Sequence, residues 1–104
     1  MDRRERNERK ARLLCELGFK KLAEDTDGAL RRRALDLVGL WEDRQTCDPA
    51  YPRRWRELLA LPTARARSIV LADDHEGLDL RMSNPFAALL TAKERRELLA
   101  EVGL

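Results

Sequence analysis

The spacing of the apolar residues constrains this chain most, because it follows the period of a helix along most of the sequence. Between positions 30 and 41, apolar residues recur at steps of three and four, and charged residues occupy the remaining faces. The apolar positions of this segment are Leu30, Ala34, Leu37, Val38 and Trp41. The strand formers Tyr and Phe are scarce, with one Tyr and two Phe, whereas Leu, Ala, Arg and Glu are abundant. The sequence therefore predicts an all-α fold.

Turn-forming residues divide the chain into segments of helical length. They cluster at 25–28, 47–52, 61–63, 73–77 and 83–85. We expect helices over about 3–23, from a cap at Thr26 or Asp27 to about 45, from Pro49 to about 61, and over 63–71. A helix of one to two turns follows over about 85–89, and the capping box of Thr91 and Glu94 begins the last helix. The prediction is a compact bundle of five to six helices in a single domain over residues 1–104.

Three short features depart from this regular pattern. Residues 78–82 alternate apolar and polar side chains, so we expect a short extended connector that lays Leu78, Leu80 and Met82 on the core. Residues 1–9 carry charge but no apolar stripe, and we expect them to form a frayed or projecting helical extension. Gly18 lies inside a helical stretch, where its missing side chain would allow close packing between helices.

The expected core combines the apolar positions of these segments. It comprises Leu14, Leu17, Leu30, Ala34, Leu37, Val38, Trp41, Trp55, Leu58, Leu59, Ile69, Val70, Leu80, Phe86, Leu89, Leu98 and Leu99. Trp41 and Trp55 flank the turn at 47–52, and an antiparallel pair of helices would pack both at its mouth with Tyr51. The alternative for these aromatic side chains is a partly exposed contact site for a partner.

Composition narrows the classes of function. The 21 basic and 19 acidic residues give a net charge of only +2, which does not by itself indicate a nucleic-acid partner. The two cysteines do not form a disulfide framework, and the N-terminal segment lacks the apolar stretch of a signal peptide. No apolar run reaches the length of a membrane span. We therefore expect a cytoplasmic protein without a membrane partner. The excess of Arg over Lys, with many Ala and Leu, suggests a bacterial or phage source.

No convergent set of nucleophile, base and charge stabiliser is visible, so we expect no enzyme activity, no cofactor and no metal site. His75 is interpreted as an exposed turn residue in preference to a pH switch or a general base. The carboxylates at 73–76 are contiguous, unlike the alternating ligands of a calcium loop. Cys15 and Cys47 are interpreted as small hydrophobic residues in preference to nucleophiles.

The functional hypothesis is a non-catalytic helical module that binds another protein, such as an immunity or antitoxin-like protein, an anti-defence inhibitor or an adaptor. The candidate contact residues lie in two basic clusters: Arg31, Arg32, Arg33, Tyr51, Arg53, Arg54 and Arg56. The alternative is a small nucleic-acid-binding regulator that uses these arginine-rich faces, although interleaved acidic residues and a pI of 8.8 disfavour it. Homo-oligomers are a further hypothesis, because the basic first third of the chain complements the acidic last third.

Overall fold

The computed structural model describes residues 2–103, and these residues form helices with no strand. Six α-helices and one 3₁₀ helix follow one another along this part of the chain, which confirms the all-α prediction. The elements are α1 (Arg3–Glu24), α2 (Ala29–Arg44), α3 (Ala50–Ala60), α4 (Thr63–Val70), α5 (His75–Met82), η1 (Phe86–Leu89) and α6 (Ala92–Glu101).

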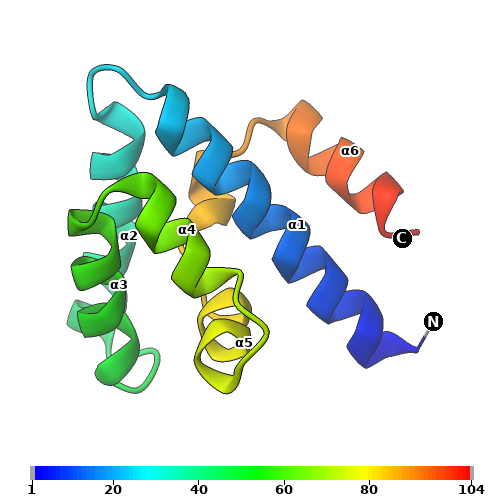
Figure 1. Cartoon of the computed structure of the whole chain (residues 1–104), viewed down its shortest axis with the longest axis horizontal. Helices are drawn as coiled ribbons and strands as arrows, with labels where there is room; N and C mark the ends of the chain where they lie inside the picture. The colour runs from blue at the N-terminus through cyan, green and yellow to red at the C-terminus, as the bar shows by residue number, and fades with distance from the viewer. Residues whose placement is uncertain (1, 104) are drawn as a thin grey trace.

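The first helix organises the bundle. In Figure 1, α1 crosses the molecule diagonally, with α2 and α3 on one side and α6 on the other. It contacts α2, α4, α5, η1 and α6, whereas α2 and α3 pack against each other as a consecutive pair. The beginning of α1 and the end of α6 lie on the same side of the view. The basic first third and the acidic last third of the chain contact each other within one molecule, because α6 packs against α1 and Lys21 of α1 lies 2.8 Å from a carboxylate oxygen of Glu94 on α6.

An aromatic cluster fills the centre of the core. The ring of Phe86 lies edge-on to the rings of Phe19 and Trp55, with centroid distances of 4.8 and 5.5 Å. The indole nitrogen of Trp55 donates a hydrogen bond of 2.7 Å to the backbone carbonyl of Ser83. These contacts tie α1 and α3 to the segment that contains η1, so residues far apart in sequence share one core.

The expected core is largely the observed one. The buried members of the expected set are Ala34, Val38, Trp55, Leu58, Leu59, Val70, Leu80, Phe86, Leu89 and Leu98. The half-buried members are Leu14, Leu17, Leu30, Leu37, Trp41, Ile69 and Leu99. The buried apolar residues outside the expected set are Ala11, Cys15, Phe19, Leu22, Ala66, Leu71 and Val102. Most of these belong to α1, whose buried stripe is therefore longer than its leucines suggest.

The expectation of an extended connector over 78–82 is wrong, because these residues form the last turns of α5. Residues two apart point to opposite sides of a helix, so the alternating residues cannot share one face. Leu80 is accordingly buried, whereas Leu78 is half-buried and Met82 is 49% exposed. The Asp74 carboxylate caps the helix by accepting a hydrogen bond of 2.7 Å from the amide of Gly77.

The helix termini agree with the sequence signals to within one or two residues. Thr91 and Glu94 form the expected capping box at the start of α6. The helix expected from Pro49, with Asp48 as its N-cap, begins one residue later at Ala50 with Pro49 as its N-cap, and Asp48 accepts a hydrogen bond from the amide of Ala50. At the other end of the chain, α1 begins at Arg3, and residue 1 lies outside the described part. Among the described residues, no helix has the length and hydropathy needed to cross a membrane.

Candidate functional site

The seven candidate contact residues lie on α2 and α3 but do not form one surface. Arg31 is half-buried and donates to the backbone carbonyl of Leu59 and, at 3.0 Å, to the hydroxyl of Thr63. It therefore ties α2 to the junction of α3 and α4. Arg32 is exposed and donates to the backbone carbonyl of Asp27 at 3.2 Å. Arg33 is also exposed.

Arg56 joins α3 to α2. Its guanidinium donates through both Nε, at 2.7 Å, and Nη2 to the same carboxylate oxygen of Glu42. This hydrogen bond lowers the pKa of Glu42 and raises the pKa of Arg56. Arg56 thus stabilises the pairing of α2 and α3, and part of its charge is neutralised within the chain.

The other three candidates line an open groove of about 600 Å³ between α3 and α5. Tyr51 is half-buried there, next to the exposed side chain of Arg53 and the half-buried side chain of Arg54. The complete lining consists of Asp48, Ala50, Tyr51, Arg53, Arg54, Glu57, Glu76, Asp79 and Leu80. We call this feature the α3–α5 groove.

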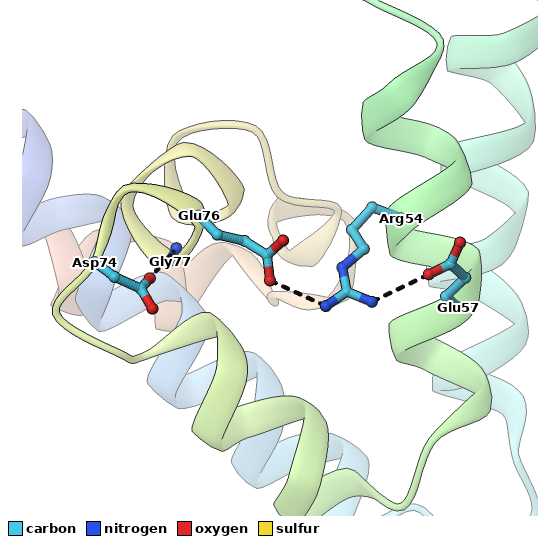
Figure 2. A network of polar contacts seen from close by, with 5 residues as sticks. All are labelled: Arg54, Glu57, Asp74, Glu76 and Gly77. Atoms are coloured by element: carbon cyan, nitrogen blue, oxygen red, sulfur yellow. Dashed lines mark hydrogen bonds and ion pairs between the residues drawn. The ribbon is translucent and has the colours of Figure 1, made fainter.

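Arg54 spans the α3–α5 groove. Its Nη1 atom lies 3.0 Å from a carboxylate oxygen of Glu57 on α3, and its Nη2 atom lies 3.0 Å from one of Glu76 on α5. Figure 2 shows the guanidinium between the two carboxylates, with the Asp74 cap beside them at the start of α5. The hydrogen bond with Glu76 is the main cause of the raised pKa of Arg54, and Glu57 adds to it. Arg54 therefore joins the two walls of the groove.

The charge of the α3–α5 groove is negative overall. Its carboxylates belong to Asp48, Glu57, Glu76 and Asp79, whereas its guanidiniums belong to Arg53 and Arg54. Arg54 pairs with Glu57 and Glu76, whereas the carboxylates of Asp48 and Asp79 are exposed and can meet a charged ligand. Tyr51 and Leu80 supply apolar area next to these charges. Such a surface favours a cationic group with an apolar stem.

No known family helps to interpret this groove. No family model, curated protein or solved structure matches the chain. The chemistry of the groove must therefore be judged from its own residues.

The titratable residues singled out in the sequence are dispersed. His75 begins α5 and is exposed, and among residues 2–103 no group of three His, Cys, Asp or Glu could hold a metal ion. Cys15 is fully buried in the core, and burial raises the pKa of its thiol to about 12. Cys47 is half-buried in a separate hollow next to Trp41 and Met82. The two cysteines and the histidine therefore do not converge.

The sequence interpretation missed the acidic wall of the α3–α5 groove. Glu76 and Asp79 were placed in a turn and an extended connector, whereas both lie on α5 and line the groove. The available signal is Asp74 followed by Glu76, because aspartate is a preferred N-cap residue and an acidic residue is favoured in the first turn of a helix. With α5 recognised as a helix, Glu76 and Asp79 fall three residues apart on one face.

Proposed function

We propose that this protein is a non-catalytic binding module whose α3–α5 groove receives a cationic segment of a partner protein. The observation that carries the proposal is the composition of the groove, in which four carboxylates and a tyrosine surround two arginines. The bridge from Arg54 to Glu57 and Glu76 sets the groove in advance, so little ordering is required when a partner binds.

The chemistry of recognition follows from the side chains that remain available. A lysine or arginine of the partner can meet the carboxylates of Asp48 and Asp79, while its aliphatic stem packs on Tyr51. A guanidinium can also stack on the tyrosine ring, a contact worth about 0.5–2 kcal/mol. Complementary charge accelerates the encounter more than it increases final affinity, which suits a small inhibitor or adaptor.

Nucleic-acid binding has less support. Arg31, Arg54 and Arg56 all donate to oxygen atoms of the chain itself, so their charge is less available to phosphates. The negative charge of the α3–α5 groove would also repel a phosphate backbone. An immunity or antitoxin-like protein, an anti-defence inhibitor and an adaptor of bacterial or phage origin all remain compatible with the proposed module.

A site-specific cross-linking experiment tests the proposal. A photoreactive amino acid replaces Tyr51 in the groove or, as a control, Arg65 on the exposed surface of α4, and both variants are produced in the native cells. We expect the Tyr51 variant to capture a protein at a Lys- or Arg-rich segment, and the Arg65 variant to capture none above background.

Charge reversal provides the matched test of specificity. Asp79→Lys places a positive charge in the groove, whereas Asp36→Lys makes the same change on the exposed surface of α2. The photoreactive residue at position 51 should no longer capture the partner protein in the Asp79→Lys variant, and it should still capture it in the Asp36→Lys variant. Capture of nucleic acid, or equal capture from both cross-linker positions, would contradict the proposed function.

A further inference from the structure

The ion pair between Arg54 and Glu76 lies inside the α3–α5 groove. Of the ion pairs among residues 2–103, it is the one that joins α3 to α5, with 3.0 Å between the Nη2 atom of Arg54 and a carboxylate oxygen of Glu76. Figure 2 shows the guanidinium in the space between the two helices, where the Glu76 carboxylate points toward it. The groove therefore already binds one guanidinium, which the chain itself supplies.

This ion pair is weakly held, because both of its side chains reach solvent. The side chain of Arg54 is 33% exposed and that of Glu76 is 52% exposed. Ion pairs that water and salt can screen contribute little to stability. Arg54 also has a second carboxylate, that of Glu57, at 3.0 Å on its own helix. Its contact with Glu76 can therefore be released without leaving the guanidinium unpaired.

Other contacts hold the two groove walls when the ion pair is released. Trp55 of α3 is fully buried, and its indole nitrogen donates at 2.7 Å to the backbone carbonyl of Ser83, directly after α5. Arg81 of α5 is also buried and donates to the backbone carbonyl of Val70 at the end of α4. Neither contact involves the exposed ion pair. We therefore expect the walls to stay in place while the released carboxylate becomes available to a ligand.

We propose that the cationic segment of the partner presents an arginine whose guanidinium replaces that of Arg54 at Glu76. This inference rests on the proposed function of the α3–α5 groove and names the side chain that the groove receives. A guanidinium has donors on two edges, and Arg54 uses them to serve two carboxylates at once. An incoming guanidinium at Glu76 has donors left for Asp79, which follows three residues later on α5 and lines the same groove. An ammonium group is a compact point charge and cannot form this two-edged contact.

Arg54 is then an internal competitor of the partner. In the free protein it covers Glu76, and the partner must displace it before its own guanidinium can bind. Because one ion pair replaces another at Glu76, the net gain comes from the additional contacts with Asp48, Asp79 and Tyr51. A cation that does not make these contacts gains little by entering the groove. The competition therefore favours a partner that fits the groove over other cations.

A peptide titration of the full chain tests the exchange. The probes are a tetra-arginine and a tetra-lysine peptide with blocked ends, and nuclear magnetic resonance of the isotope-labelled protein follows their binding. We expect the tetra-arginine peptide to shift the amide signals of groove residues and the guanidinium signals of Arg54, and to bind more tightly than the tetra-lysine peptide. Unchanged guanidinium signals at saturation would show that Arg54 keeps its contact with Glu76, and would overturn the exchange.

Two substitutions separate competition from the general effect of charge. Arg54→Gln removes the competitor, whereas Arg53→Gln removes the same charge from an exposed residue of the groove that joins none of the ion pairs among residues 2–103. We expect Arg54→Gln to lower the Kd of the tetra-arginine peptide by about twofold to fivefold more than Arg53→Gln does, which corresponds to the loss of an exposed ion pair. Glu76→Gln should weaken binding, and in its presence Arg54→Gln should have no more effect than Arg53→Gln.

The outcomes distinguish this inference from the proposed function. If the peptides bind in the groove but Arg54→Gln weakens binding, or tightens it no more than Arg53→Gln, the exchange is wrong and the groove remains a site for cations. Equal affinities for the two peptides would reject the preference for arginine in the same way. If neither peptide shifts a groove signal, the exchange is overturned as well, and the cross-linking result at Tyr51 then decides the proposed function.

Discussion

At the scale of single residues, Gly18 determines how closely α1 approaches η1. A Cβ atom built on Gly18 would lie 2.3 Å from two ring carbons of Phe86, well inside van der Waals contact. Phe86 cannot easily move away, because its ring is held between Phe19 and Trp55. The sequence interpretation anticipated close packing at Gly18, but only the fold identifies the aromatic ring that requires it.

A pair of glycine substitutions tests this constraint. Gly18→Ala should lower the free energy of unfolding by about 1–3 kcal/mol, because the added methyl group overpacks the core. Gly39→Ala is the matched control, since its nearest neighbour is a guanidinium nitrogen of Arg56 at 3.5 Å, an ordinary contact. The free energy of unfolding of Gly39→Ala should rise by up to about 1 kcal/mol, because alanine has a higher helix propensity than glycine. Urea denaturation measures both, and equal stability of Gly18→Ala and the parent chain would contradict the packing argument.

At the scale of elements, α5 depends on contacts with α4 more than on its own sequence. Arg81 is buried, and its Nη1 atom donates to the backbone carbonyls of Val70 at 2.7 Å and Ala72 at 2.9 Å. These carbonyls lie at the end of α4 and in the following turn, where helix carbonyls lack an internal partner. One guanidinium therefore completes α4 and anchors the last turn of α5.

Removing this guanidinium should destabilise the protein strongly. Arg81→Leu leaves the buried carbonyl of Val70 and the half-buried carbonyl of Ala72 without this donor, so we expect a loss of about 2–4 kcal/mol in the free energy of unfolding. Arg67→Leu serves as the control, because Arg67 is exposed on α4, and it should change stability by less than about 0.5 kcal/mol. Thermal and urea unfolding measure both variants. Similar stabilities for the two variants would show that Arg81 does not hold these elements together.

The elements that the sequence predicts well are those with local signals. The capping box at Thr91 and the apolar stripe of α2 require only neighbouring residues, and both appear where expected. The missed helix, α5, has only eight residues and alternates in its second half, so its local pattern favours an extended segment. Its helical form is stabilised by the Asp74 cap and by the contacts of Arg81 with α4, and the second of these requires the tertiary fold.

At the scale of the whole molecule, the candidate site also combines features that local sequence signals predict with features that depend on the tertiary fold. Tyr51, Arg53 and Arg54 stand out in the sequence as an aromatic residue within a basic cluster. Their placement opposite Glu76 and Asp79 depends on how the tertiary fold sets α3 and α5 on the two sides of the groove, across a chain separation of more than 20 residues. Sequence patterns therefore identify basic residues, whereas the fold determines which of them pair within the chain.

The buried thiol of Cys15 links the core to the alkaline stability of the whole protein. Burial is the main cause that raises its pKa from 9.0 to about 12, and Glu16 adds to it, whereas Arg81 and Arg12 act in the opposite direction. The folded state therefore retains a proton that the unfolded chain releases above pH 9. The stabilisation from this proton is fully present below about pH 9 and is lost as pH rises toward 12.

Cys15→Ala removes the titrating thiol and should therefore reduce the loss of unfolding free energy between pH 9 and pH 12. We expect the difference in unfolding free energy between the parent chain and Cys15→Ala to shrink by up to about 1.4 kcal/mol for each pH unit above 9. Cys47→Ser is the control variant, because Cys47 is half-buried in a hollow next to Trp41 and not in the core. Urea denaturation at a series of pH values measures all three chains. A difference that stays constant across the alkaline range would show that Cys15 does not couple its proton to folding.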